Sequence, residues 1–257
     1  MTSTLTSSID LAEILFTLFW VFFIGLVFYL RREDKREGYP LESDRGGSAA
    51  VQGFPSMPSP KTFRLAHGGE QQAPRQGANA RDIAAEPAAP HPGAPLIPTG
   101  NPMLDGVGPA SYAQRSDTPD LTLDGENRVV PMRIADDFSV MGRDADPRGM
   151  SVHGTDGVDV GTVSDLWVDR SEPQIFFLEV DLNEANGGRS ALLPFAFADV
   201  DKGKRSIKVD ALYSHQFRDV PALASPDQVT LLEEDKINAY YAGGLFYADA
   251  SRQEPLL

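Results

Sequence analysis

The feature that most constrains this chain is an almost wholly apolar run at residues 11–30. Its 20 residues carry one charged side chain, Glu13, near the start. At about 1.5 Å of rise per residue, a helix of this length reaches roughly 30 Å, the thickness of the hydrocarbon core of a bilayer. The run therefore predicts one transmembrane helix at residues 11–30. A buried helix of a soluble protein is the disfavoured alternative, because apolar residues follow one another almost unbroken.

Charges at the two ends of the run predict its orientation. Asp10 and Glu13 mark the N-terminal end, whereas four basic residues crowd the C-terminal end: Arg31, Arg32, Lys35 and Arg36. Basic residues accumulate on the cytoplasmic side of a span. Residues 1–10 are therefore predicted to lie outside and the long remainder in the cytoplasm. No Lys or Arg precedes Arg31, so the run lacks the basic start of a secretory signal peptide and is expected to be retained.

Composition excludes several classes of function. The chain has 23 basic and 37 acidic side chains and a formal charge of -14, which would repel the phosphates of nucleic acid. It has no cysteine, so disulfides, thiolate nucleophiles and Cys-ligated metal sites are excluded. The histidines have no metal-ligand spacing and are interpreted as solvated or hydrogen-bonded: His67, His91, His153 and His215.

Residues 31–126 are predicted to form an extended surface segment. Twelve of the 20 prolines fall between Pro55 and Pro119, and proline interrupts both helices and interior strands. Within this segment, residues 70–95 have few large apolar side chains, a composition that favours disorder.

Residues 127–257 are predicted to form a mainly-β domain, a small barrel closed by one C-terminal helix. Short runs of β-branched and aromatic residues alternate with turn signals such as Asp156-Gly157 and Lys202-Gly203. The expected strands are residues 128–134, 150–153, 158–169, 174–182, 190–197 and 206–212. Along residues 174–182, the face that carries Phe176, Leu178, Val180 and Leu182 is the better candidate for the core.

The expected C-terminal helix covers residues 232–248, where apolar residues recur at helical spacing. Carboxylates at its start favour the positive end of the helix dipole. Gly243 and Gly244 would weaken the helix by about 1 kcal/mol each relative to alanine. A glycine pair at that position therefore predicts close packing or the approach of a ligand.

Carboxylates are the only dense reactive groups in the chain. Gly106-Val107-Gly108 is a lone GxG that matches neither a P-loop nor a dinucleotide-binding turn. Acidic residues cluster in sequence about Trp167 and at the start of the C-terminal helix: Asp165, Asp169, Glu172, Glu179 and Asp181, then Glu233, Glu234 and Asp235. Such groups either form a solvated face or, when close together, raise one another's pKa and pass protons along.

Several stretches together resemble the H subunit of the photosynthetic reaction centre of purple bacteria. They are residues 30–41 (LRREDKREGYPL), 60–63 (PKTF) with Leu65 and 67–69 (HGG), 98–112 (PTGNPMLDGVGPASY), 134–140, 146–150 (DPRGM), 161–172 (GTVSDLWVDRSE) and 227–247 (DQVTLLEEDKINAYYAGGLFY). They span nearly the whole chain in order, and the segment around residues 70–95 departs freely.

The resemblance implies a fold with one transmembrane helix, an extended region and a cytoplasmic PRC-barrel-like domain. It implies a non-catalytic subunit of a light-driven electron-transfer complex in the bacterial inner, intracytoplasmic photosynthetic membrane, with a periplasmic tail at residues 1–10. The implied partners are the L and M subunits and membrane lipids, with a cytochrome subunit and light-harvesting antenna in the same complex. Bacteriochlorophyll, bacteriopheophytin, quinones and non-haem iron would belong to L and M, and this chain would bind none directly. Its implied role is to cap the cytoplasmic face, stabilise the quinone region and assist proton transfer to the secondary quinone.

The resemblance also implies proton-transfer residues. Asp169 and Glu172 match family positions on the proton pathway, and Asp124 matches a position near its entrance. Where some members carry two histidines just after that aspartate, this sequence has Glu126 and Arg128, and Gln228 replaces an acid found in some members. Glu126 is the candidate substitute. Glu234 matches a family acid of buried character, with a structural role at the helix start as an equal alternative.

Two other classes of function remain as alternatives. A membrane-anchored adaptor could use a PRC-barrel to bind an unrelated complex, although the PKTF, PTGNPMLDGVGPAS and REGYPL stretches have no reason to occur together in one. A carboxylate-dependent enzyme would need a substrate-binding signature, which the sequence lacks.

Overall fold

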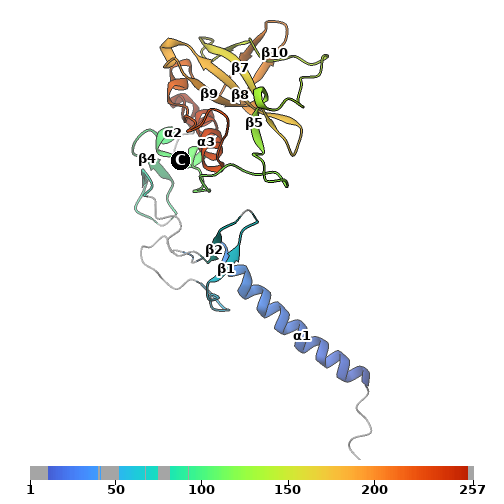
Figure 1. The fold of residues 1–257 in the computed structure, drawn as a ribbon. Helices are drawn as coiled ribbons and strands as arrows, with labels where there is room; N and C mark the ends of the chain where they lie inside the picture. The colour runs from blue at the N-terminus through green and yellow to red at the C-terminus, as the bar shows by residue number, and fades with distance from the viewer. Residues whose placement is uncertain are drawn as a thin grey trace, which may run out of the picture. The chain divides into compact units, whose positions relative to one another are not determined.

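The computed structural model describes residues 11–39, 41, 52–66, 68–74, 82–91 and 93–253 (Figure 1). The chain divides into two compact units, Met1–Ala80 and Arg81–Leu257. The predicted periplasmic tail at residues 1–10 lies outside the described residues, as do residues 75–81 and 92 of the segment 70–95.

The first unit begins with helix α1 (Leu11–Glu33), which contains the whole predicted span. None of its residues is buried, and residues Leu11–Arg36 are long and apolar enough to cross a membrane. A short 3₁₀ turn, η1 (Asp34–Arg36), follows the helix. The helix predicted at residues 11–30 is confirmed, and it continues through the basic residues that follow the apolar run.

A small hairpin is attached to the base of α1. Strands β1 (Lys61–Arg64) and β2 (Glu70–Ala73) pair antiparallel. Arg36 binds the Glu33 carboxylate through two hydrogen bonds of 2.9 and 3.0 Å and reaches the Ser59 and Ala73 carbonyl oxygens. Lys61 completes the contact with a 2.6 Å ion pair to Glu33. One cluster of charged side chains therefore links the end of the helix to the hairpin.

The second unit opens with short elements in the proline-rich region. Strands β3 (Ala85–Pro87) and β4 (Leu96–Pro98) pair antiparallel, followed by helix α2 (Pro102–Asp105) and the 3₁₀ turn η2 (Gly108–Ala110). Helix α2 begins because the Asn101 side chain accepts a hydrogen bond from the Met103 amide and proline occupies the first helical position. Strands β2 and β3 thus lie within the segment 70–95, whose composition favours disorder.

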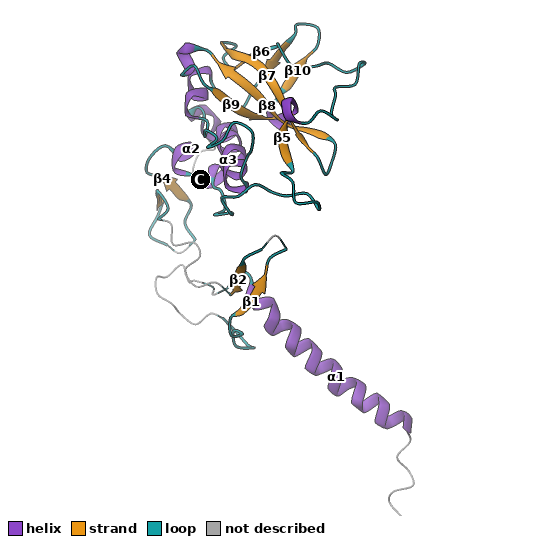
Figure 2. Cartoon of the chain, in the orientation of Figure 1, coloured by secondary structure: helices purple, strands orange, loops and turns teal. Residues whose placement is uncertain are grey.

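A seven-stranded sheet forms the centre of this unit (Figure 2). Its strands are β5 (Val129–Pro131), β6 (Ser151–His153), β7 (Asp159–Asp169), β8 (Gln174–Leu182), β9 (Ser190–Pro194), β10 (Asp199–Asp201) and β11 (Ser206–Lys208). The order is β10-β11-β6-β7-β8-β9, with β5 paired to β7, and only β11 and β6 run parallel. The mainly-β prediction is confirmed.

Several predicted strands are shorter than the sequence suggested. The runs at 128–134 and 190–197 both turn into 3₁₀ helix, η3 (Met132–Ile134) and η5 (Phe195–Phe197), directly after Pro131 and Pro194. Proline has no amide donor for the ladder, so the strands end there. The run at 206–212 ends as a strand at Lys208, and β10 was not predicted.

The core face of β8 is the predicted one, but it is not the only buried face. Leu178, Val180 and Leu182 are buried as expected, whereas Phe176 is half-buried. Phe177, on the opposite face, is also fully buried, opposite Trp167 in the pairing of β7 with β8. The prediction of the better core face is therefore confirmed, and the burial of Phe177 shows that this part of the sheet is covered on both sides.

Helix α3 (Leu231–Tyr247) matches the predicted C-terminal helix to within one residue at each end. Thr230 and Glu233 form a reciprocal capping box, with hydrogen bonds of 3.1 and 2.8 Å. A Cβ atom added to Gly243 would lie 2.5 Å from the Cβ of Ala110 in η2, and one added to Gly244 would lie 2.7 Å from Leu212 Cδ2. The close packing predicted for the glycine pair is confirmed.

This packing gives a test of the joint between α3 and η2. Gly243→Ala should destabilise the chain by about 1 to 2 kcal/mol, because overpacking against Ala110 outweighs the gain of about 1 kcal/mol in helix propensity. Gly142→Ala is the matched control, because no heavy atom lies within 4 Å of an added Cβ there. Chemical denaturation of the detergent-solubilised chain, followed by near-ultraviolet circular dichroism, measures both. An equal stability for the two variants would contradict the close contact.

Candidate functional site

Asp169, the last residue of β7, forms a buried ion pair with Arg128, the residue before β5. Pairing of the two strands places Val129 opposite Asp169, so Arg128 lies beside the carboxylate. Arg128 donates to Asp169 Oδ2 from Nε at 2.8 Å and from Nη2 at 2.7 Å. The other oxygen, Oδ1, accepts from the amides of Ser171 at 2.8 Å and Glu172 at 3.0 Å. Asp169 is 1% exposed, so these four donors replace its hydration.

This environment keeps Asp169 ionised. Burial by itself raises the pKa of the Asp169 carboxyl, but the Arg128 guanidinium and the two backbone amides outweigh it and hold the pKa below its ordinary value. The same pair raises the pKa of Arg128. Asp169 is therefore a fixed negative charge near neutral pH, and its hydrogen-bond donors are all supplied by the protein.

Glu234, in the first turn of α3, interacts with some of the same charged side chains, but its pKa is shifted in the opposite direction from that of Asp169. Burial raises the pKa of the Glu234 carboxyl, Arg115 partly offsets this, and the neighbouring Asp120 and Asp235 raise it further. Asp120 also pairs with Arg128 at 3.2 Å. Arg128 thus connects Asp169 with the carboxylates beside Glu234, and Glu234 is the member that more readily holds a proton.

The other sequence-predicted acids are exposed around this pair. Glu172 follows Asp169 by one turn, and its carboxylate accepts from the Gln174 amide at 3.4 Å. Glu126 pairs with Arg170, the residue after Asp169, at 3.0 Å. Asp124 lies in an exposed turn closed by the Gly125 amide and the Thr122 carbonyl oxygen. Asp169, Glu172 and Glu126 are therefore neighbours, Glu234 joins them through Arg128 and Asp120, and Asp124 stands two residues from Glu126.

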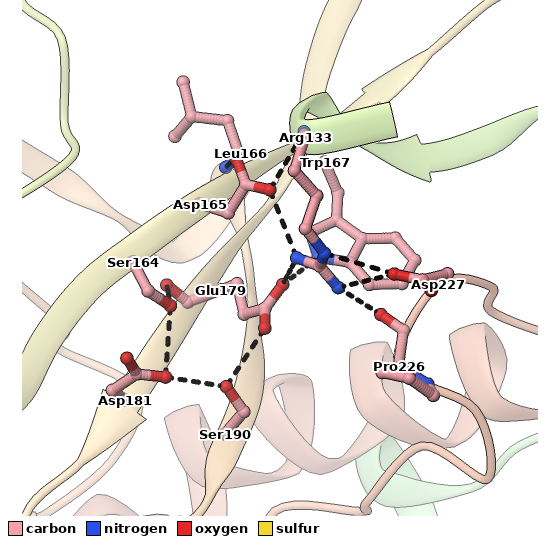
Figure 3. Close-up of polar contacts among 10 residues, drawn as sticks. All are labelled: Arg133, Ser164, Asp165, Leu166, Trp167, Glu179, Asp181, Ser190, Pro226 and Asp227. Atoms are coloured by element: carbon pink, nitrogen blue, oxygen red, sulfur yellow. Dashed lines mark hydrogen bonds and ion pairs between the residues drawn. The ribbon is translucent and has the colours of Figure 1, made fainter. Parts of the chain in front are cut away.

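A second polar cluster, centred on Arg133, was not predicted (Figure 3). Arg133 pairs with Asp165 at 3.1 Å, Glu179 at 2.7 Å and Asp227 at 3.0 Å, and it also donates to the Pro226 carbonyl oxygen. Trp167 Nε1 donates to Glu179 at 2.8 Å. Ser190 then bridges Glu179 and Asp181, at 3.1 and 2.8 Å.

One signal indicates this cluster once the pairing of β7 with β8 is known. Asp165 and Glu179 lie opposite each other in the β7–β8 ladder, and like charges in that relation destabilise a sheet. A partner cation was therefore required, but only the tertiary structure identifies it as Arg133. Among the residues that the structure describes, no three His, Cys, Asp or Glu side chains are placed to hold a metal ion.

Two regions of the chain match known protein families. Residues 3–134, about half of the chain, match the N-terminal region of the photosynthetic reaction centre H-chain. The chain belongs to the photosynthetic reaction centre H-chain family. Residues 140–216 match the PRC-barrel domain, which confirms the expected class of β domain.

Membership in the H-chain family makes this chain a reaction-centre H subunit, and the family implies association with the L and M subunits. The family and the apolar helix α1 fit a single-pass protein of the inner membrane. Asp124 and Glu126 lie in the H-chain match and Asp169 and Glu172 in the PRC-barrel match, whereas Glu234 lies beyond both.

The buried pair predicts a defined dependence of stability on pH. Because folding lowers the pKa of Asp169, the pair stabilises the fold above the ordinary aspartate pKa of about 3.9 and loses this contribution as pH falls through the lowered value. Asp169→Asn should lower the free energy of unfolding by about 2 to 4 kcal/mol near neutral pH, because Arg128 loses its buried partner. The difference from the unmodified chain should shrink as the solution is made strongly acidic.

Glu126→Gln is the matched control, because it removes an acid from an arginine pair at a site where the Glu126 side chain is 67% exposed. Its cost should stay below about 1 kcal/mol. Denaturant titrations at several pH values measure both variants. Equal costs for the two, or a cost of Asp169→Asn that does not vary with pH, would contradict the role of the buried pair.

Proposed function

We propose that this H subunit caps the cytoplasmic face of the L and M subunits, shields the quinone region from water and assists proton transfer to the secondary quinone. The pigments, quinones and non-haem iron are assigned to the partner subunits. The observation that carries the proton role is the connected group of Asp169, Arg128, Asp120 and Glu234, flanked by exposed carboxylates. The match of residues 3–134 favours this function over an adaptor of an unrelated complex.

The members of this group have different tasks in the proposal. Asp169 is held as an anion by four donors, so it acts as a fixed charge that favours nearby protonated groups. Glu234 has a raised pKa, so it can bind and release a proton nearer to neutral pH than an ordinary carboxyl. The exposed Asp124, Glu126 and Glu172 collect protons from the solvent, with Glu126 as the candidate substitute in a rearranged route.

The net negative charge of the whole chain supports a role in proton uptake. With 37 acidic and 23 basic side chains, the protein has a negative field that attracts protons and other cations to its surface. A reduced quinone beneath a protein cap needs protons from groups spread over a distance that no single side chain spans. A series of carboxylates, with one fixed anion and one acid of raised pKa, meets that requirement.

Purification from the native membrane tests membership in a pigmented complex. A tagged chain should co-elute with protein that absorbs in the near infrared, because the L and M subunits carry the bacteriochlorophylls. The tagged chain expressed in cells that lack L and M is the control and should elute without colour. A colourless complex from the native membrane would contradict the assignment.

Flash spectroscopy of the reaction centre tests the proton role. Asp169→Asn combined with Glu172→Gln should slow proton uptake after the second flash severalfold and leave primary charge separation unchanged, because only the cytoplasmic proton route is altered. Glu234→Gln alone should also slow uptake, since it removes the acid of raised pKa.

Asp181→Asn is the control for these measurements. Asp181 is an exposed carboxylate on β8, seven residues from Gln174, which pairs with Asp169. At about 3.3 Å per residue it lies roughly 23 Å along the strand from that position. Its uptake rate should equal that of the unmodified complex. Unchanged uptake in all the variants would reduce these carboxylates to a structural role.

A further inference from the structure

A buried lysine in η1 holds residues 52–55 against the C-terminal end of α1. Lys35, in η1, is 4% exposed. Its ammonium donates to the carbonyl oxygens of Gln52, of Gly53 at 3.0 Å and of Pro55 at 2.5 Å. An ammonium has three N–H donors, so the three carbonyl groups use all of them. Residues 52–55 are thereby held at one place beside the helix.

Phe54 lies inside this held segment, yet its side chain points outward. It is 85% exposed, the most exposed phenylalanine among the described residues. Its ring centroid lies 5.5 Å from that of Phe28, on α1. Because Gly53 and Pro55 on either side are bound by Lys35, the backbone cannot withdraw Phe54 from the surface.

The position of Phe28 gives the depth of this aromatic pair. Phe28 stands two residues before the end of the apolar run at residues 11–30, which is about 3 Å along a helix axis. The Phe28–Phe54 pair therefore lies at the level where the hydrocarbon core meets the lipid headgroups. An exposed phenylalanine there continues the apolar surface of the span.

The charges around the pair match an anionic lipid surface. Residues 31–64 contain seven basic and five acidic residues, a net charge of +2, in a chain whose total is -14. Lys61, which pairs with Glu33, lies 5.9 Å from the centre of the Tyr29 ring, and the side chain of Arg31, 3.6 Å from Asp34, is 69% exposed. Aromatic rings beside Lys and Arg are typical of the interface of a membrane, and anionic lipids attract such basic groups.

We propose that Phe54 is a second membrane anchor, which enters the interface of an anionic phospholipid bilayer beside Phe28 while Lys35 holds its backbone in place. The occupant of this surface is lipid. The anchor fixes the depth and the rotation of α1, because a side chain outside the helix now meets the bilayer at a set distance from the helix axis. This inference rests on residues of the first unit, from α1 to β1, and is independent of the proton role.

Site-directed spin labelling tests the proposal. The chain has no cysteine, so Phe54→Cys gives one labelling site in the full chain. In vesicles of phosphatidylcholine and phosphatidylglycerol, the label should be accessible to oxygen, which partitions into lipid, and protected from a water-soluble nickel chelate. Its ratio of oxygen to nickel accessibility should lie between that of Ile24→Cys, in the middle of the span, and that of a label in water.

Leu65→Cys is the matched control, because Leu65 is an apolar residue that is 47% exposed in the same unit. It follows β1, four residues beyond the Lys61–Glu33 contact, and Figure 1 shows the β1–β2 hairpin extending past the end of α1. Its label should be accessible to the nickel chelate. A label at position 54 with the same accessibility as that at 65 would overturn the proposal.

Two further measurements test the role of Lys35 and distinguish a lipid contact from a protein contact. Lys35→Met in the Phe54→Cys chain should move the label toward water, because the carbonyl groups that hold residues 52–55 lose their common donor; an unchanged depth would overturn the role of Lys35. In the assembled reaction centre the label should remain accessible to oxygen. Protection from both reagents there would mean that a protein partner covers Phe54, which also overturns the proposal.

Discussion

The carboxylates of strand β7 are stabilised by two arginines, one before β5 and one after it. Strand β5 is buried, but it has three residues and pairs with β7 alone, through three ladder pairs. Arg128 pairs with Asp169 at one end, and Arg133 pairs with Asp165 and Glu179 at the other. Without these cations, Asp165 and Glu179 would face each other with no positive charge between them, and Asp169 would be buried unpaired. Both arrangements destabilise a fold.

The same arginines join the two family regions of the chain. Arg128 and Arg133 belong to the H-chain region at residues 3–134, whereas Asp165, Asp169 and Glu179 belong to the PRC-barrel region at residues 140–216. These ion pairs, together with the β5–β7 ladder, cross the boundary of the two matches within the one compact unit that residues from Arg81 onward form. The barrel region of this subunit is thus completed by residues from outside it.

Local patterns predicted the elements that depend on local chemistry. The span, strands β7 and β8 and helix α3 follow from apolar runs, alternation and helical spacing, and the glycine pair at Gly243 indicated a close contact. Features that depend on distant partners were missed. Arg133 could be recognised as the centre of a cluster only once the β7–β8 register was known, and Phe177 could be placed in the core only once both faces of the sheet were seen to be covered.

The acids of the candidate site also combine a local signal with a dependence on distant partners. Their sequence positions suggested a group, but the fixed charge of Asp169 depends on Arg128, 41 residues earlier. The raised pKa of Glu234 likewise depends on its burial and on Asp120. No local pattern carries that information, because neighbours in space set the charge state of a carboxyl group.

The packing of residues 108–120 along α3 has a consequence for the timing of synthesis. Ala110 lies against Gly243, and the Thr118 carbonyl oxygen accepts from the Leu231 amide at 3.0 Å. The ribosome makes α3 roughly 110 residues after this segment, an interval of about 5 to 20 seconds. During that interval residues 108–120 lack their packing partner α3, so they can bind other chains before they pack against their own helix.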